Sequence, residues 1–341
     1  MEESPGLRHF AWESEDMIGL HCLLLVLFLL ALAGNALAAD WLWAKGNIHT
    51  HTTNSDGDSP PQDVIKWYQD HGYQFLAITD HGKMTDPVPL DAPDDNFILI
   101  AGEELGVKDA KKPIHGNAFG IMQTIGNAES RATHVSSLAG LVEHVRKAHG
   151  IPQVNHPNFG WSFGHRELLS VKGPYLLEVF NGHPAVNNAG NFAYLPVEQT
   201  WDILLSNGKT VYATATDDAH NLKTISDSKA NPGRGWVYVH VYELSPNAIL
   251  DSLAKGDFYA STGVELADYS FDGKEFRVQA KPGKKYLIRF VGKWGSILQE
   301  TVGDSAVYRL TGKAEPNGYI RCKVISSDGK VAWTQAYRIK G

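Results

Sequence analysis

Short apolar runs alternate with helix-like segments from Trp41 to about Tyr242, and this alternation limits the possible folds more than any other feature. Each run is rich in β-branched or aromatic residues and is bounded by turn formers, as is typical of strands. The predicted strands cover residues 74–79, 97–102, 118–122, 175–180, 210–216 and 236–242. Such alternation over about 200 residues predicts an α/β architecture with a parallel sheet, either open or closed into a barrel.

The helices between these strands have recognisable ends. Ser59 followed by Pro60 predicts an N-cap and a first-turn proline for a helix that stops at Gly72. The segment SSLAGLVEHVRKAHG has apolar residues at i, i+3 and i+4, and Gly150 follows as a stop signal. Two further helices are expected over residues 195–208 and 245–256. The last of them is expected to close the α/β part of the chain.

After the stretch FYASTG the pattern changes to period-2 runs joined by tight turns. The dipeptides Asp272-Gly273 and Asp328-Gly329 are strong hairpin signals. We therefore expect residues 266–341 to form a small, all-β, sandwich-like antiparallel module that follows a domain of residues 40–265.

The first 39 residues are predicted to be a signal peptide. An uninterrupted apolar core runs over residues 23–33, and Ala36-Leu37-Ala38 is an A-x-A cleavage pattern. That core is shorter than the roughly 20 residues that a membrane-spanning helix needs, so cleavage is expected rather than a stable membrane anchor. The residues before the core are acidic, which fits a true start at Met17, with residues 1–16 mis-annotated. The expected location is the periplasm or the cell exterior.

Charge and cysteine content exclude several classes of protein. The 341 residues carry a formal net charge of -7 without a run of Lys or Arg, which disfavours a nucleic-acid partner. Of the two cysteines, Cys22 lies in the predicted signal peptide, so Cys322 remains alone. A disulfide scaffold and a thiolate metal site are thereby excluded. We expect a small-molecule substrate.

Polar residues of the metal-ligand type recur where the predicted strands end. They are His49, His51, Asp56, Asp80, His81, Glu103, Glu104, His115, His156, Glu178, Asn181, His183, Asp217, Asp218 and His220. Because the carboxyl ends of parallel strands gather on one face of a sheet, these scattered residues can meet in one pocket. His49 and His51 are two positions apart, so both imidazoles point to the same side of an extended chain. That arrangement suits chelation of one ion.

Other histidines have simpler interpretations. His71, His134, His144 and His149 lie on or beside predicted helices and are interpreted as surface residues. His240 lies inside a predicted strand and fits a core histidine. The residues at the strand ends differ from these, because chance would have to place ligand-type residues at one strand end after another.

Several imidazoles with carboxylates and no cysteine suit Zn²⁺, Mn²⁺ or Fe²⁺. So large a set of candidate ligands is too many for one ion, so two or three divalent metal ions with shared carboxylates are predicted. Such a cluster lowers the pKa of a bound water and stabilises an anionic transition state. The leading hypothesis is a phosphoesterase that uses a metal-bridging hydroxide. The alternatives are hydrolysis of a carboxylic or carbamate ester, or a binding protein that holds metal without turnover.

These motifs resemble the PHP family, named for polymerase and histidinol phosphatase domains. The resemblance covers roughly residues 43–265 and keeps the motif order HTHTTNSDG, AITDHG, GEEL, NHP and DDAH. It implies a distorted (β/α)7 barrel with a trinuclear metal centre at the carboxyl ends of the strands. The stretches NPGRGWVYV and FYASTG also resemble an exported stand-alone subgroup with an appended β module. Some relatives in that subgroup split carbamate or aryl esters.

The resemblance also implies a metal-ligand set in three groups. The first group is His49, His51, Asp218 and Glu104, the second is Glu104, His115 and His156, and the third is Asp56, His81 and His220. Glu104 is preferred to Glu103 because the family motif is Gly-x-Glu and Gly102 fixes its register.

Four residues are predicted to act in catalysis, namely Glu104, Asp218, His183 and Arg234. Arg234 and Lys83 are the basic residues nearest to the motifs, and a phosphate needs such donors. His183 or His165 could protonate a leaving group. Asn181 and Asp217 are expected to orient the ligands.

Overall fold

The fold is described from a computed structural model of the chain. It describes Met1 and residues 41–88, 90, 96–311 and 318–339. The chain divides into two units, Met1–Asp40 and Trp41–Gly341, and the second is described below. The predicted signal peptide and Cys22 lie outside the described residues. Within the described part of the chain, no helix combines the length and the apolar character needed to cross a membrane.

One large sheet runs through the second unit. Its first nine strands are β1 (Leu42–Asn47), β2 (Phe75–Ile78), β3 (Ile98–Gly106), β4 (His115–Phe119), β5 (Ile151–Val154), β6 (Tyr175–Asn181), β7 (Val211–Thr216), β8 (Trp236–Val241) and β9 (Phe258–Ser261). They follow the spatial order β9-β8-β1-β2-β3-β4-β5-β6-β7. The side chains of β2 and β9 are buried throughout, which explains why these strands appear as continuous apolar runs in the sequence.

The sheet is mixed, so the expectation of a parallel sheet holds for only some of its pairs. The pairs β1–β2, β2–β3, β5–β6 and β6–β7 are parallel. The pairs β3–β4, β4–β5, β1–β8 and β8–β9 are antiparallel. Between β3 and β4 lie only residues 107–114, which are too few for the helical crossover that a parallel pair requires.

Backbone hydrogen bonds return the end of β7 to the end of β1. The amide of Asp218 donates to the carbonyl of His49 at 2.9 Å, and the amide of His51 donates to the carbonyl of Ala219 at 2.8 Å. These bonds bring the carboxyl ends of the first and last parallel strands side by side. The (β/α)7 barrel requires more than this contact and stays a prediction.

The helices are α2 (Pro61–Asp70), α3 (His134–Lys147), α4 (His165–Leu168), α5 (Val197–Ser206) and α6 (Pro246–Lys255). Ser245 caps α6 by accepting from the Ala248 amide, and Gly256 ends the helix with a φ of 75°. The prediction for α2 was wrong by one residue, because Pro60, not Ser59, is the N-cap. Single-turn 3₁₀ segments, η1 (Phe159–Trp161) and η2 (Lys293–Gly295), complete the helical elements.

Several strand predictions differ from the structure. Strand β3 continues to Gly106, so Glu103 and Glu104 lie inside it and not after its end, and β1 and β9 were not among the predicted strands. The strand expected over residues 118–122 lies earlier, at His115–Phe119, because Gly120 has a φ of 71° and ends it. His115 is therefore inside a strand and not before one. Strand β5 was not predicted, since the run IPQV contains a proline and only two β-branched residues.

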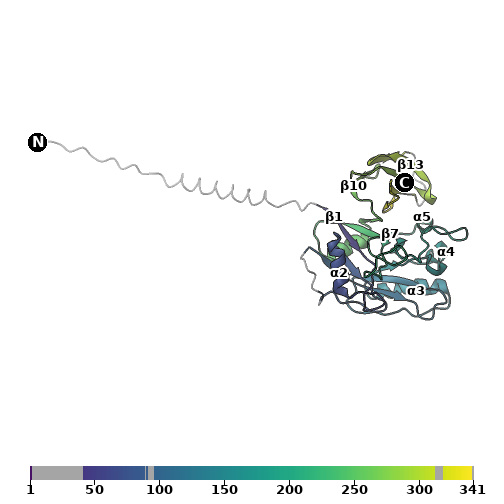
Figure 1. The fold of residues 1–341 in the computed structure, drawn as a ribbon. Helices are drawn as coiled ribbons and strands as arrows, with labels where there is room; N and C mark the ends of the chain where they lie inside the picture. Colours follow the sequence, from purple (N-terminus) through teal and green to yellow (C-terminus); the bar gives the residue numbers. More distant parts are fainter. Residues whose placement is uncertain (2–40, 89, 91–95, 312–317, 340–341) are drawn as a thin grey trace. The chain divides into compact units, whose positions relative to one another are not determined.

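The C-terminal region contains the strands β10 (Leu266–Phe271), β11 (Glu275–Ala280), β12 (Tyr286–Val291), β13 (Ile297–Val302), β14 (Ser305–Arg309), β15 (Tyr319–Ser326), β16 (Val331–Thr334) and β17 (Tyr337–Arg338). The predicted turns at Asp272-Gly273 and Asp328-Gly329 join the antiparallel pairs β10–β11 and β15–β16. In Figure 1 these strands lie at the α5 end of the unit, away from α2 and α3.

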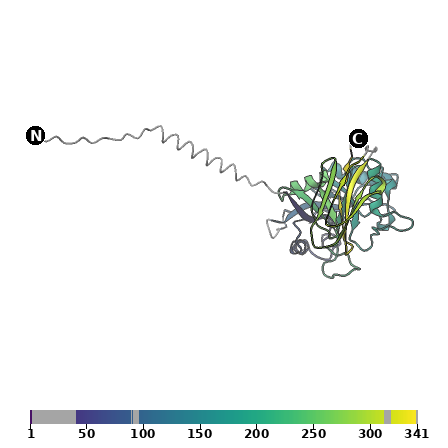
Figure 2. The same ribbon diagram turned by 90° about the horizontal axis from the view of Figure 1, so that it is seen from above.

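Two layers of strands pack together in this region. Strands β10, β11 and β14 form a three-stranded sheet, and β13, β12, β15 and β16 belong to the large sheet. Phe276 of the small sheet packs against Phe290 of the large one, with ring centroids 5.5 Å apart. Strand β16 pairs with β9, so the large sheet continues across the predicted domain boundary at residue 265. Figure 2 shows these C-terminal strands, in yellow, beside the green strands from the middle of the chain.

Candidate metal centre

His49 and His51 follow the end of β1, and their imidazoles approach the same two carboxylates. Nε2 of His49 lies 3.3 Å from Oε2 of Glu104 and 3.2 Å from Oδ1 of Asp218. Nε2 of His51 lies 3.2 Å from each of the same two oxygens. All four side chains are buried. The structure therefore brings the first predicted ligand group together.

Glu104, on β3, presents its second oxygen to another pair of histidines. Its Oε1 lies 3.3 Å from Nδ1 of His115 and 3.3 Å from Nε2 of His156. Glu103 occupies the next position on the strand and points the other way, where it accepts from the amides of residues 125 and 126. One carboxylate, that of Glu104, thus links two ligand groups, as the sequence resemblance implied.

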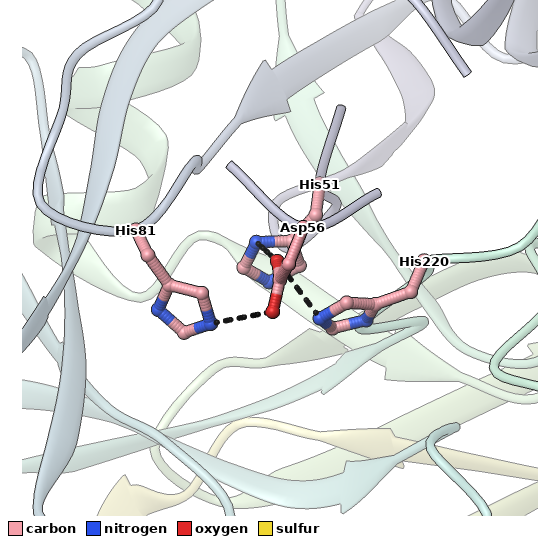
Figure 3. A group of neighbouring side chains, drawn as sticks. All are labelled: His51, Asp56, His81 and His220. Atoms are coloured by element: carbon pink, nitrogen blue, oxygen red, sulfur yellow. Dashed lines mark ion pairs between the residues drawn. The ribbon is translucent and has the colours of Figure 1, made fainter. Parts of the chain in front are cut away.

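The third group gathers around Asp56 (Figure 3). The carboxylate lies between three imidazoles, with Oδ2 3.6 Å from Nε2 of His81 and Oδ1 3.4 Å from Nε2 of His220. Nδ1 of His51 lies 3.6 Å from Oδ1. The side chain of Asp56 is 55% exposed, so this group lies at the open side of the centre. His51 is close enough to serve either the first or the third group.

Asp80 holds the loop that carries Asp56. One oxygen of Asp80 accepts from the Thr52 amide at 2.8 Å and from the Ser55 hydroxyl at 2.7 Å, and the other accepts from the hydroxyls of Thr52 and Thr85. The loop folds so tightly that a Cβ atom at Gly57 would lie 2.6 Å from the His51 carbonyl oxygen. The acidic residue of the AITDHG motif therefore fixes a loop, while the neighbouring His81 reaches the centre.

Glu178 orients two of the candidate ligands through hydrogen bonds to His49 and His156. Its Oε1 accepts from Nδ1 of His49 at 2.6 Å, and its Oε2 accepts from the His156 amide at 2.8 Å. Asn181 donates to Glu178 and to Asp218 from the same amide nitrogen. Sequence reasoning named Glu178 as a strand-end residue but gave it no role. Its position inside the buried run YLLEVF was the only available signal.

The donor set fits divalent cations. Because Nδ1 of His49 donates to Glu178, a neutral ring directs the lone pair of Nε2 at the carboxylates of Glu104 and Asp218. Among the described residues, neither this nitrogen nor the ring nitrogens of His51 has a hydrogen-bond partner. Buried lone pairs that face carboxylates repel them unless a cation lies between. Each of the three groups places its ligand atoms within 4.8 Å of one another.

The pKa values of the clustered side chains also indicate a site for cations. Burial lowers the pKa of His49, but Asp218, Glu178 and Glu104 outweigh burial and raise that pKa well above its usual range. Burial also lowers the pKa of His51, but Asp218 and Glu104 outweigh burial and raise that pKa to about 9. Burial raises the pKa of Glu104, but the imidazoles around it hold that pKa well below its usual range. The carboxylates are therefore ionised at neutral pH. A buried imidazole nitrogen beside them is stabilised when it binds either a proton or a metal ion.

Two of the candidate ligands have backbone conformations that non-glycine residues rarely adopt. Asp218 has a φ of 51° and His156 a φ of 27°. Such conformations cost free energy and persist where the surroundings impose them, often at functional sites. Here the imposing contacts are the backbone bond from Asp218 to His49 and the bond from the His156 amide to Glu178.

The centre opens into a cavity of about 350 Å³, within the size range of small-molecule sites. Its lining residues are Asp56, His81, Glu104, His115, His156, Phe159, His183, Asp218 and His220. The Ala185 amide donates to Nδ1 of His183, so the ring proton of neutral His183 is on Nε2. Burial and the nearby histidines lower the pKa of His183 against the opposing effect of Asp218.

Four other sequence candidates have different surroundings. The guanidinium of Arg234 donates to the carbonyls of Gly182 and Ser226, and Arg234 does not line the cavity. Lys83 and His165 are likewise outside the lining. Asp217 accepts from the amides of residues 233, 234 and 235 and from the Tyr68 hydroxyl, which fixes the segment beside Asp218. Among the described residues, no lysine or arginine lines the cavity.

Part of this centre lies in a segment that matches a known domain family. Residues 47–175 match the PHP domain. This PHP segment contains His49, His51, Asp56, His81, Glu104, His115 and His156. Asp218 and His220 lie beyond it, and the backbone bonds between the ends of β1 and β7 bring them to the same centre.

One curated relative is the DNA polymerase/3'-5' exonuclease PolX of Bacillus subtilis, which is 23% identical over 217 residues. The match covers 56% of this chain and only 37% of that protein. The chain therefore spans little more than a third of the length of that relative.

Solved structures with partial similarity include a two-domain protein of Bacteroides vulgatus described as containing a PHP-like metal-dependent phosphoesterase. It is 17% identical, covers 87% of this chain and 96% of its own, and has a TM-score of 0.46. An amidohydrolase of Chromobacterium violaceum is 15% identical, covers 53% of this chain and 89% of its own, and has a TM-score of 0.38. A protein of Bifidobacterium adolescentis described as a metal-dependent phosphoesterase is 14% identical, covers 55% and 89%, and also has a TM-score of 0.38.

Proposed function

We propose that this chain is a metal-dependent hydrolase whose substrate is a small phosphoester. The observation that carries the proposal is the meeting of three His–carboxylate groups at one cavity, with Glu104 shared between two of them. The match of residues 47–175 to the PHP domain supports a phosphoesterase over other hydrolases. His, Asp and Glu without cysteine suit Zn²⁺, Mn²⁺ or Fe²⁺.

In this proposal, the three groups would hold two or three divalent ions, with Asp218 serving the first and His220 the third. Bound ions of this kind supply Lewis acidity and lower the pKa of a water molecule toward neutrality. Glu178 holds the tautomer of His49 that leaves Nε2 free. His183 offers its Nε2–H to the cavity and would donate a hydrogen bond to a leaving-group oxygen.

One observation favours a second candidate, hydrolysis of a carboxylic or carbamate ester. A phosphate monoester usually meets lysine or arginine donors, yet among the described residues no such side chain lines the cavity. Arg234, the predicted donor, is bonded to two carbonyls. A less charged ester needs no such donor.

A paired rate assay separates the two candidates. Purified protein loaded with Mn²⁺ or Zn²⁺ is given 4-nitrophenyl phosphate and, separately, 4-nitrophenyl acetate. We expect metal-dependent release of nitrophenol from the phosphate and its loss in His49→Ala, because that imidazole contacts both Glu104 and Asp218. His71→Ala is the matched control, since His71 is exposed at the end of α2 and stacks on Trp67.

Turnover of the acetate alone would replace the phosphoesterase proposal by the ester candidate. Turnover of neither substrate by protein that keeps its metal would overturn the hydrolase proposal and favour a binding role.

Replacement of Glu178 by glutamine tests the ligand-orienting role without touching a proposed ligand. Each oxygen of Glu178 accepts from donors only, so an amide NH₂ at this place would face an N–H or O–H group. We expect metal affinity to fall by about 10- to 100-fold, the usual loss for such supporting residues. Competition with a chelator measures the affinity, with exposed Glu143→Gln on α3 as the control. Unchanged affinity would contradict the assigned role.

A further inference from the structure

One aromatic ring stands out in the wall of the cavity. Phe159 is the single apolar side chain among the lining residues, and the others are histidines and carboxylates. Its ring centroid lies 5.2 Å from that of His156, 6.2 Å from His183 and 6.5 Å from His115. A ligand that enters beside His156 and His183 therefore meets an apolar surface on one side.

The segment that carries Phe159 is firmly held. The Phe159 amide donates to the His156 carbonyl at 2.8 Å. The side-chain amide of Asn158 donates to the carbonyls of Asn187 and Leu195, which ties η1 to the connection between β6 and α5. Because the backbone that carries the ring is held in this way, less backbone freedom is lost when the ring contacts a ligand.

Further aromatic side chains lie on the η1 segment and on the connection between β6 and α5. Trp161 stacks on Tyr194 with ring centroids 4.6 Å apart and an interplanar angle of 21°. Tyr194 is 41% exposed, and Phe192, two residues before it, is fully exposed. Trp161 lies two residues beyond Phe159, so the stacked pair and the cavity wall share the anchored segment. Neither Trp161 nor Tyr194 lines the cavity, so this pair helps to hold the segment that carries Phe159 and is not part of the cavity wall.

We propose that Phe159 forms a subsite for a flat aromatic group of the substrate. This inference rests on the proposed hydrolase function and specifies its substrate class as aryl or arylmethyl esters. With no lysine or arginine in the described lining, stacking on Phe159 is the main contact available to the part of the substrate that does not react. A purely structural role for Phe159, shielding His156 from water, would give no preference between ligands.

The test compares two stable probes that differ only by a ring, phenylphosphonate and methylphosphonate, bound to metal-loaded protein and measured by calorimetry. We expect the phenyl probe to bind about tenfold more tightly, in line with the strength of aromatic pairing plus burial of the ring. Phe159→Ala is expected to remove this preference while leaving methylphosphonate affinity and metal content unchanged. Phe159→Leu keeps an apolar side chain without the ring and should lose most of the preference.

Tyr242→Ala is the matched control, because Tyr242 is 52% exposed and follows β8, whose last residues pair with the first residues of β1. That end of the sheet is opposite the metal centre. Equal affinity for the two probes, binding of neither, or an equal loss for both in Phe159→Ala would overturn the subsite. Turnover in the nitrophenyl assays reports on the hydrolase proposal separately, so either proposal can fail while the other stands.

Discussion

Replacement of Glu104 by glutamine is expected to release bound metal and to abolish turnover. Glu104 is buried, and its two oxygens contact five imidazoles: Oε2 faces His49, His51 and His81, and Oε1 faces His115 and His156. A glutamine amide has only one acceptor oxygen. Its NH₂ group would replace the other oxygen and face the imidazole nitrogens of one of these two sets. Supporting residues cost about 10- to 100-fold when removed, and we expect a shared ligand to exceed that range. Elemental analysis after dialysis and kcat/KM measure the two effects.

Glu103→Gln is the matched control for this prediction. Glu103 is the preceding residue, is equally buried, and accepts from the amides of Ile125 and Gly126 on the other face of β3. The glutamine leaves one of those amides without a full acceptor, which costs about 1–3 kcal/mol of unfolding free energy. Metal content should nevertheless stay at the wild-type level. Metal retention by Glu104→Gln, or equal metal loss in both variants, would contradict the assignment of Glu104 as the shared ligand.

The candidate ligands could be predicted because their signals are local. The Asp-His pair and the Asp-Asp-x-His stretch each follow an apolar run, and such runs mark strand ends in a single sequence. The His-x-His pair is a signal by its spacing alone, because residues two apart share a side of an extended chain. The choice of Glu104 over Glu103 depended on one residue of register, and the alternation of side chains along β3 places Glu104 among the imidazoles. The predicted ends of α6, Ser245 and Gly256, were confirmed because capping is also a local property.

Features that depend on long-range contacts were not predictable. The antiparallel pairing of β4 with β5, which α3 separates in the sequence, follows from how distant segments fit together, and the sequence of β4 carries no sign of direction. Glu178 acquires its role only because His49, 129 positions earlier, comes within 2.6 Å of it. Arg234 was chosen for its charge and its nearness to a motif. The Gly182 carbonyl that it contacts belongs to the connection after β6, and the Ser226 carbonyl lies eight residues earlier in the connection that carries Arg234 itself.

Replacement of Arg321 by alanine is expected to destabilise the protein more than any surface change. Arg321 lies on β15 and is 1% exposed. Its guanidinium donates to both oxygens of Asp202 on α5 at 2.8 Å and to Glu198 at 2.9 Å. Removing one partner of a buried ion pair costs about 3–5 kcal/mol, because the remaining charge loses its compensation. Denaturant-induced unfolding measures this loss.

The double variant Arg321→Met/Asp202→Leu is the informative control. It removes both charges and fills the space with apolar side chains, so it should be much closer to wild type than Arg321→Ala alone. Tyr319 also donates to Asp202, at 2.7 Å, and its hydroxyl loses that acceptor in the double variant. A double variant as unstable as Arg321→Ala would show that the interaction is stabilising in itself and that the loss is not a penalty of uncompensated charge.

Acidification should weaken the same contact. Burial raises the pKa of Glu198, but Arg321 and Lys323 outweigh burial and hold that pKa below its usual range. A carboxylate with a lowered folded-state pKa stabilises the fold at neutral pH, and this stabilisation is lost as the pH falls through the lowered pKa. The gap in unfolding free energy between wild type and Arg321→Ala should therefore narrow in acid.

Helix α5 directly follows the connection that carries His183 and Tyr194, so this contact joins the C-terminal strands to a helix that positions one wall of the cavity. We therefore expect the C-terminal region to act as a brace for the site, with activity and stability falling together in Arg321→Ala.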